Sequence, residues 1–583
     1  MYKRPITRRE FLKAASVTTA GTVLAACVPP SEQPPVENVV QPTTAELPTT
    51  QSLATALPQP TVGGVNKKGG YFVWGIEIEP PGFNPISNDD WYEIWIYGMS
   101  NEPLTWGGEN FGSDLNPVLA ESWEVSEDGL TWTIHLRKGV TWQDGKPFTA
   151  DDVLFWAAAI QDPATERTEW CRSRFFFGET PHKFEKVDEL TIKITTSEPV
   201  PSLMGDICVP LIPKHYFVDN KISNAEMLKS KFNTGGELLG TGPFRITDYK
   251  RGEAVKMEKY KDYWRGEPYL DGMVFRIVPD KQALLVAAQT GEIDVCCLNP
   301  EDVEQLKGSD KVEAKVFDTD GMWHFKLNID KPYLTDKRTR QALMYALDRQ
   351  AFVQTMMLGY GKVADSFFTP FVTAYRPLSP AYEFNPDKAK QLLEEVGWKM
   401  GTDGIYQAEN VEGVAKGTPF KLVIDITEES KVQPSELAQS YWKKIGIDVT
   451  LRQIDTNVWD DENYNKDNKK YDVYWSTIGS VGSNGYNYYW LIAPASKRES
   501  LTNYYNTKVI DLFNEGKSQK AKAERDKFLD QAVQIVWDEL PLLPVFFEAT
   551  IYAISKRVHM EECPLDASTW VLWHTPEKLW VEQ

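Results

Sequence analysis

The chain has 583 residues, more than one hydrophobic core usually holds, so its length predicts two or three lobes. Hydrophobic residues make up 42% and charged residues 25%, which excludes wholesale disorder and a collagen-like or disulfide-knot scaffold. The formal net charge of −20 repels phosphate backbones and argues against a nucleic-acid partner. Aromatic residues reach 12%, enough for an aromatic-lined ligand cleft beside a large core.

Residues 1–26 are predicted to be an export signal. Thr7 to Lys13 contains the paired Arg8 and Arg9 and is similar to a twin-arginine signal. The apolar run that follows is too short to span a membrane and ends in Leu-Ala-Ala-Cys27, which resembles a lipobox. The resemblance implies that Arg8 and Arg9 direct export and that Cys27 carries a lipid anchor. The alternative is an ordinary signal peptide with an incidental cysteine.

Residues 27–67 are predicted to be a disordered tether behind that anchor. They are rich in Pro, Thr, Gln, Ser and Val and cannot bury enough apolar surface to order themselves. As a flexible coil, such a segment spans roughly 35 Å. No later segment has the 18 consecutive apolar residues of a spanning helix. We therefore expect attachment to the membrane by lipid, with the body outside the cytoplasm, in a periplasmic space or on the outer face of the cytoplasmic membrane.

Motifs for catalysis, metals and cofactors are absent from the sequence. The six histidines are scattered and none neighbours a cysteine, which argues against a zinc or nickel site. There is no G-x-S-x-G elbow, P-loop or dinucleotide fingerprint. We therefore expect no catalytic residue, no metal, no cofactor and no enzyme activity. Pairing stays open for the five later cysteines, which are Cys171, Cys208, Cys296, Cys297 and Cys563.

The elements are most legible between residues 118 and 160. Residues 122–125 predict a strand, Asp128-Gly129 a hairpin turn, and 130–137 a half-buried strand in which apolar and polar residues alternate. A helix is expected from about residue 150, with Thr149 as N-cap and Asp152 completing a capping box.

Further elements predict a mixed α/β body. Residues 273–278 predict a strand, and 280–290 a helix that ends at Gly291, before a strand resumes at residue 293. Thr335 is expected to cap the helix that carries Leu343 and Leu347 on one face.

Blocks along the chain resemble family 5 solute-binding proteins, the extracytoplasmic oligopeptide-, dipeptide-, nickel- and oligosaccharide-binding components of ABC importers. The resemblance covers essentially residues 68–583. The blocks that carry it are residues 119–123, 128–140, 144–153, 197–201, 212–216, 240–244, 291–295, 336–349, 389–397, 442–447 and 543–546.

The resemblance implies an α/β, two-lobed, periplasmic-binding-protein-like fold with an additional inserted domain and a hinge between the lobes. By analogy, lobe I comprises residues 68–105, 188–312 and 546–583, the inserted domain 106–187 and lobe II 313–545. It also implies a function: capture of a small solute between the lobes and delivery to an ABC permease with its ATPase. A secreted glycoside hydrolase and a surface adhesion or signalling protein on the same fold are the alternatives from other classes.

The solute is expected to be an oligopeptide, the commoner role in the family, with an oligosaccharide as the alternative. Several relatives fix a peptide ammonium with an Asp that follows a Tyr/Phe-Asp-Val block. Here the block is residues 471–473, and Val481 stands where that Asp is expected. Either another carboxylate, such as Asp89 or Asp90, replaces it, or the ligand has no free amine there, because a desolvated ammonium without a partner is costly.

An aromatic cleft is expected to do the recognition, with the alternative for each aromatic that it belongs to the core. Trp475 lies in the loop that contacts ligand in relatives, and Trp323 lies in a strand-like segment that in relatives runs beside the ligand. The candidate ligand-binding residues are Trp323, Trp475, Trp490, Tyr486, Asn484, Asp89, Asp90 and Trp91.

Overall fold

The computed structural model describes residues 67–87, 91–106, 115–177, 179–370, 374–464, 469–479, 494, 500, 502–519, 522–563 and 575–583. These residues fall within one compact unit, Asn66–Gln583. The predictions for Arg8, Arg9, Cys27 and most of the tether lie outside the described residues. No helix in the described ranges is long and apolar enough to cross a membrane.

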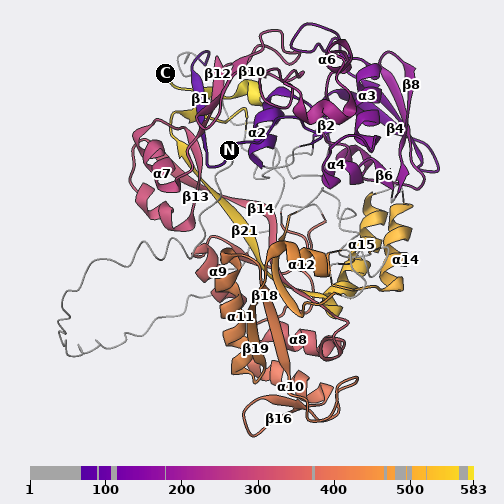
Figure 1. The fold of residues 1–583 in the computed structure, drawn as a ribbon, viewed down its shortest axis with the longest axis vertical. Helices are drawn as coiled ribbons and strands as arrows, with labels where there is room; N and C mark the ends of the chain where they lie inside the picture. Colours follow the sequence, from indigo (N-terminus) through magenta and orange to yellow (C-terminus); the bar gives the residue numbers. More distant parts are fainter. Residues whose placement is uncertain are drawn as a thin grey trace, which may run out of the picture. The chain divides into compact units, whose positions relative to one another are not determined.

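One mixed sheet runs through the whole compact unit (Figure 1). β1 pairs in parallel with β12 and β13, and β18 with β19, whereas β21 is antiparallel to β13 and β14. The strands, in spatial order, are β10 (Phe244–Lys250), β11 (Ala254–Lys259), β12 (Gly272–Ile277), β1 (Tyr71–Ile76), β13 (Val295–Leu298), β21 (Leu542–Ser555), β14 (Val312–Leu327), β20 (Val473–Ile478), β18 (Lys421–Ile426) and β19 (Asp448–Gln453), with β15 (Lys362–Val363) paired to β21.

Two large hydrophobic cores divide this unit into two lobes. The first contains Trp74 and Tyr552, and the second contains Phe325 and Phe546. The long strands β14 and β21 pass from one core to the other (Figure 1). The helices of the first lobe are α2 (Trp91–Ser100) and α7 (Lys281–Thr290), and those of the second are α8 (Lys337–Tyr345), α9 (Arg349–Met357), α10 (Pro386–Val396), α11 (Val432–Lys444), α12 (Thr456–Asn463), α14 (Thr507–Lys517) and α15 (Lys522–Glu539).

A separate antiparallel sheet follows the first elements of the first lobe. Its order is β4 (Ala120–Val125), β5 (Thr131–Leu136), β9 (Thr191–Thr195) and β8 (Lys183–Asp188). α3 (Ala150–Gln161) packs on it through Trp156, whose ring lies 6.5 Å from that of Phe184. The buried side chains of β5 are Trp132, Ile134 and Leu136, which confirms the predicted alternation.

The boundaries expected for lobe I, the inserted domain and lobe II stay predictions. They can be compared with the ends of the observed strands. β9 belongs to this four-stranded sheet although it lies beyond the expected limit at residue 187. The expected limits of lobe II, residues 313 and 545, fall inside the continuous strands β14 and β21.

Shorter elements complete the fold. They are β2 (Thr105–Trp106), β3 (Asn116–Pro117), α4 (Glu169–Ser173), β6 (Phe176–Phe177), β7 (Thr180–Pro181), α5 (Leu203–Asp206), α6 (Lys214–Asp219), η1 (Asn224–Lys229), η2 (Pro300–Leu306), η3 (Pro332–Leu334), β16 (Trp398–Met400), β17 (Tyr406–Ala408), η4 (Glu429–Lys431), β22 (Val558–His559), η6 (Pro576–Lys578) and β23 (Trp580–Val581).

The helix caps test the local predictions. Thr149 and Asp152 form the expected capping box, and Gly291 ends α7 with a φ of 86°, a value that favours glycine. The prediction for Thr335 is wrong. Asp336 caps α8 by accepting the Arg338 N–H, while the Thr335 hydroxyl donates to the carbonyl of Lys331 at 3.1 Å. A carboxylate one residue closer to the helix therefore takes the capping position.

All five described cysteines are free thiols. Cys171, Cys296 and Cys563 are buried. Burial raises the pKa of Cys296 to about 12, so that thiol stays protonated and behaves as a small apolar side chain.

Candidate ligand-binding site at the hinge strands

One face of β21 connects the two cores. Successive side chains of a strand point to opposite faces, so Phe546, Glu548, Thr550 and Tyr552 share one face. Phe546 belongs to the second core and Tyr552 to the first. Glu548 and Thr550 lie between them and are half-buried. A polar stretch is thus held between two apolar clusters where the chain passes from lobe to lobe.

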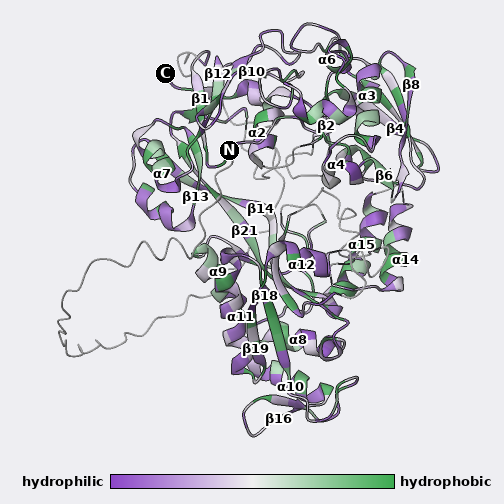
Figure 2. Ribbon diagram, in the orientation of Figure 1, coloured by the Kyte–Doolittle hydropathy of each residue, from purple (hydrophilic) through white to green (hydrophobic). Residues whose placement is uncertain are grey.

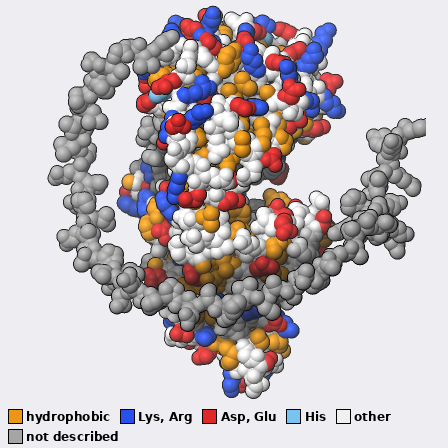
Figure 3. All heavy atoms as spheres, turned by 90° about the vertical axis from the view of Figure 1, so that its left-hand side faces the viewer, with side chains coloured by type: hydrophobic (Ala, Val, Ile, Leu, Met, Phe, Trp, Pro, Cys, Tyr) orange, Lys and Arg blue, Asp and Glu red, His pale blue; other side chains and the backbone are white. Residues whose placement is uncertain are grey.

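β14 completes this face. The Phe317 ring lies 5.8 Å from that of Tyr552, and the Trp323 ring lies 6.3 Å from that of Phe546. We call the set the hinge face, and its members are Phe317, Trp323, Phe546, Glu548, Thr550 and Tyr552. On the side shown in Figure 3, the surface is hollowed between the two lobes, and acidic and basic side chains are interspersed over the first lobe.

A break in strand pairing shapes the middle of the hinge face. Asp318 pairs with Ala549 and Met322 with Phe547, so the residues between them bulge out of the ladder. The Thr319 hydroxyl donates to the Glu548 carbonyl at 3.1 Å and accepts the Gly321 N–H at 3.1 Å. A Cβ at Gly321 would lie 2.8 Å from Glu548 Oε2, so the glycine allows the carboxylate to lie close to the backbone.

Glu548 and Trp323 interact within the hinge face. Burial raises the pKa of Glu548 above its ordinary value. The Trp323 indole, acting as a hydrogen-bond donor, lowers it by a smaller amount and favours the charged form. The Trp323 ring is held in place by stacking on the Trp475 ring, which lies 5.4 Å away at an angle of 14°.

Trp475 belongs to the core of the second lobe. Its side chain is 1% exposed, and its ring lies 4.6 Å from that of Phe325 and 6.0 Å from that of Phe352 on α9. The expectation that Trp475 itself lines a cleft is therefore replaced by the core alternative, with Trp323 as the half-buried outer member of the pair. Figure 2 shows β18 of this lobe as mainly hydrophobic.

The first lobe contributes a second polar group beside Tyr552. Glu77 directly follows β1, where it accepts the Tyr92 hydroxyl and lies 3.4 Å from the Lys281 ammonium. Tyr552 and Cys297, from β21 and β13, are hydrogen-bonded to each other. The carboxyl ends of β1 and β13, which are parallel, meet at this edge of the sheet. In α/β folds, ligands bind outside the carboxyl ends of strands.

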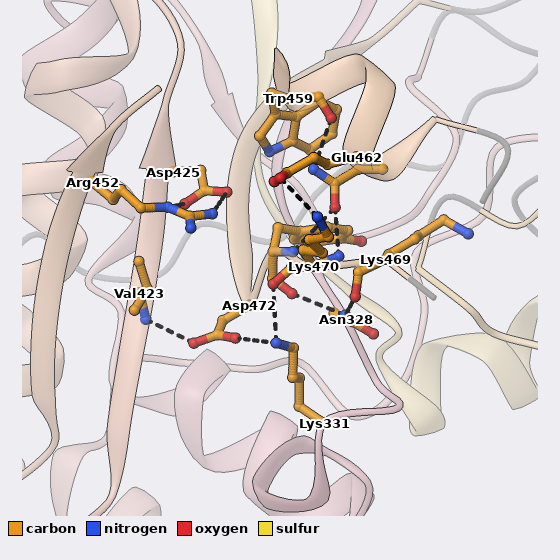
Figure 4. Close-up of polar contacts among 12 residues, drawn as sticks. Asn328, Lys331, Val423, Asp425, Arg452, Trp459, Glu462, Lys469, Lys470 and Asp472 are labelled. Carbon is orange, nitrogen blue, oxygen red and sulfur yellow. Dashed lines mark hydrogen bonds and ion pairs between the residues drawn. The ribbon is translucent and has the colours of Figure 1, made fainter. Parts of the chain in front are cut away.

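The Tyr471-Asp472-Val473 block has a structural role (Figure 4). The Asp472 carboxylate accepts the Val423 N–H at 3.1 Å and pairs with Lys331 at 3.0 Å. The Asn328 side-chain amide donates to the carbonyls of Lys469 and Tyr471. These contacts fix the start of β20 against β14 and β18, so the acid of the block is already paired.

The remaining candidate residues have no described side chain. Trp490, Tyr486, Asn484, Asp89 and Asp90 lie outside the described residues. Trp91 begins α2, and only its backbone is described. Sequence reasoning missed Glu548 and Thr550, although one charge inside the apolar run Leu542–Ser555 was a signal of a special position. Within the described ranges, no group of three or more His, Cys, Asp or Glu side chains could hold a metal ion.

Residues 114–499 match the model of the family described as "Bacterial extracellular solute-binding proteins, family 5 Middle". The chain is 29% identical over 469 residues to the heme-binding protein A of Haemophilus influenzae. The alignment covers 76% of this chain and 81% of that protein. The chain is 26% identical over 511 residues to the dipeptide-binding protein of Escherichia coli, covering 83% and 91%.

Solved structures share the fold. The ABC transporter substrate-binding protein CtaP of Listeria monocytogenes has a TM-score of 0.75 at 27% identity, with coverage of 89% of this chain and 100% of that one. The oligopeptide-binding protein AppA of Bacillus subtilis, solved with a nonapeptide, has a TM-score of 0.69 at 24% identity with the same coverage. The chain belongs to family 5 of the bacterial extracellular solute-binding proteins, the two-lobed substrate-binding proteins of ABC importers, which are not enzymes.

Proposed function

We propose that this protein captures an oligopeptide between its two lobes and delivers it to an ABC permease. The observation that carries the proposal is the hinge face, which places a polar, half-buried stretch of β21 between the two cores. Relatives named as dipeptide-binding and glutathione-binding proteins, at 26% and 27% identity, support a peptide-like solute. Ligand contacts made by both lobes would favour a closed arrangement.

The ligand can be identified by native mass spectrometry of protein purified without refolding. We expect one or more peptides, released on denaturation and sequenced by fragmentation. Thermal-shift measurements with dipeptides, glutathione, oligosaccharides and haem then rank the classes, because a bound ligand raises the melting temperature by mass action. Stabilisation by an oligosaccharide or by haem, with none by any peptide, would overturn the peptide assignment.

The proposal includes export through the Arg8-Arg9 signal and anchoring through a lipid on Cys27. The order and spacing of the two motifs support it. Cys27→Ser should release the protein from the membrane fraction, because the lipid would be its only attachment. A variant that still sediments with membranes would contradict the anchor. An Arg8→Lys, Arg9→Lys variant, retained inside the cell, tests the export step separately.

A further inference from the structure

We propose that Glu548 is the residue that receives a cationic group of the ligand, an ammonium or a guanidinium, against the ring of Trp323. This inference rests on the proposed function and adds a charge requirement to it. It comes from a comparison of Glu548 with three acids on or next to the same sheet, Asp294, Asp425 and Glu77.

These three acids on or next to the central sheet each have a cation. Asp294 pairs with Arg557 at 2.6 Å, and Asp425 pairs with Arg452 at 2.7 Å. Glu77, at the first-lobe edge of the hinge face, has Lys281 at 3.4 Å. Each of these carboxylates is compensated within the protein, as buried charges normally are.

Glu548 differs from these acids. Within the described residues, no lysine, arginine or histidine nitrogen lies within 4.0 Å of its carboxylate. Among the described residues, the Trp323 indole acts on the charge of this carboxylate, and no positive charge does. Burial in the absence of a cation raises the pKa of the carboxyl group. The protein thus keeps a carboxylate at the hinge that gains from an opposite charge supplied from outside.

The surroundings of Glu548 suit a cation. An indole attracts an ammonium or guanidinium through its π face, and a carboxylate adds a charge-assisted hydrogen bond. Trp323 is held in place by its stack on Trp475 at 5.4 Å, so the site is preorganised. The carboxylate and ring lie on β21 and β14, which both cores share. A cation bound there would be in reach of both lobes.

A neighbouring acid supplies a matched control. Asp318 lies on β14 opposite Ala549, is exposed, and pairs with Lys362 at 2.6 Å. Asp318→Asn removes one negative charge from the same hinge, but from a carboxylate that already has a cation. Glu548→Gln keeps the shape of the side chain and removes its charge.

The test uses competition between charged and neutral forms of the same peptides. A peptide digest is mixed in equal amounts with the same digest acetylated at all amines, and the peptides retained by the full-length protein are quantified by mass spectrometry. We expect wild type and Asp318→Asn to retain the free-amine forms about tenfold or more over the acetylated forms, since hydrogen bonds to charged groups are the strong ones. Glu548→Gln should lose most of that preference.

The outcomes separate the two claims. Among peptides without arginine, retention of both forms equally by wild type, or an unchanged preference in Glu548→Gln, overturns the role of Glu548 and leaves peptide binding intact. Retention of no peptide in either form overturns the proposed function, and with it this inference. The wild-type measurement alone decides the charge requirement even when Glu548→Gln does not fold, and a matching melting temperature shows that the variant folds.

Discussion

Trp323 and Trp475 stack on each other but should respond to truncation in different ways. Trp475 is 1% exposed and packs against Phe325 and Phe352, so Trp475→Ala opens a cavity in the second core. Such a change costs about 3–5 kcal/mol. For a lobe of this size, that lowers the melting temperature by on the order of 10 °C.

Trp323→Ala is expected to act mainly on binding. Its ring is half-buried at the hinge face and interacts with Glu548, so its removal costs less stability and weakens binding of a free-amine peptide about tenfold. Melting temperature and calorimetric affinity are measured on both variants. The assignment is refuted if Trp475→Ala melts like wild type while its affinity collapses, since that result would place Trp475 in the cleft.

Two further outcomes follow from the same structure. His324 is fully buried on β14, and burial, together with the nearby Lys326 charge, lowers its pKa to about 3. Because the unfolded state binds a proton near pH 6.5 and the folded state does not, stability is lost as pH falls from about 6.5 toward 3, by about 1.4 kcal/mol per pH unit. The free energy of unfolding, measured with denaturant between pH 6.5 and 4.5, should depend less steeply on pH in His324→Gln than in wild type, by that amount. Identical slopes would contradict the burial of a neutral imidazole. Small-angle scattering should show a smaller radius of gyration when peptide is added at saturation, because contacts with both lobes favour closure, and an unchanged profile would argue against a moving hinge.

Local features of the fold could be predicted from the sequence because neighbouring residues determine them. The alternation in β5, the capping box of Thr149 and Asp152, and the glycine at residue 291 depend only on adjacent residues. Where two capping residues stand side by side, as at Thr335 and Asp336, local reasoning has no means to choose, and the carboxylate took the position.

The site depends on pairings between distant strands, which the sequence does not display. Trp475 lies in the core because β20 pairs with β14 and so places it opposite Phe325. Glu548 is special because β14 bulges opposite it and because no cation of the described residues reaches it. The family resemblance pointed to the segments around Trp323 and Trp475. The roles of the residues there follow from the register of β14, β20 and β21.

A crystal structure of the protein with its co-purified ligand tests the central claim most directly. The account predicts a peptide bound between the lobes, with an amine or guanidinium nitrogen within about 3 Å of the Glu548 carboxylate and next to the Trp323 ring. A ligand bound away from the hinge face, or one that places no positive charge at Glu548, would contradict it.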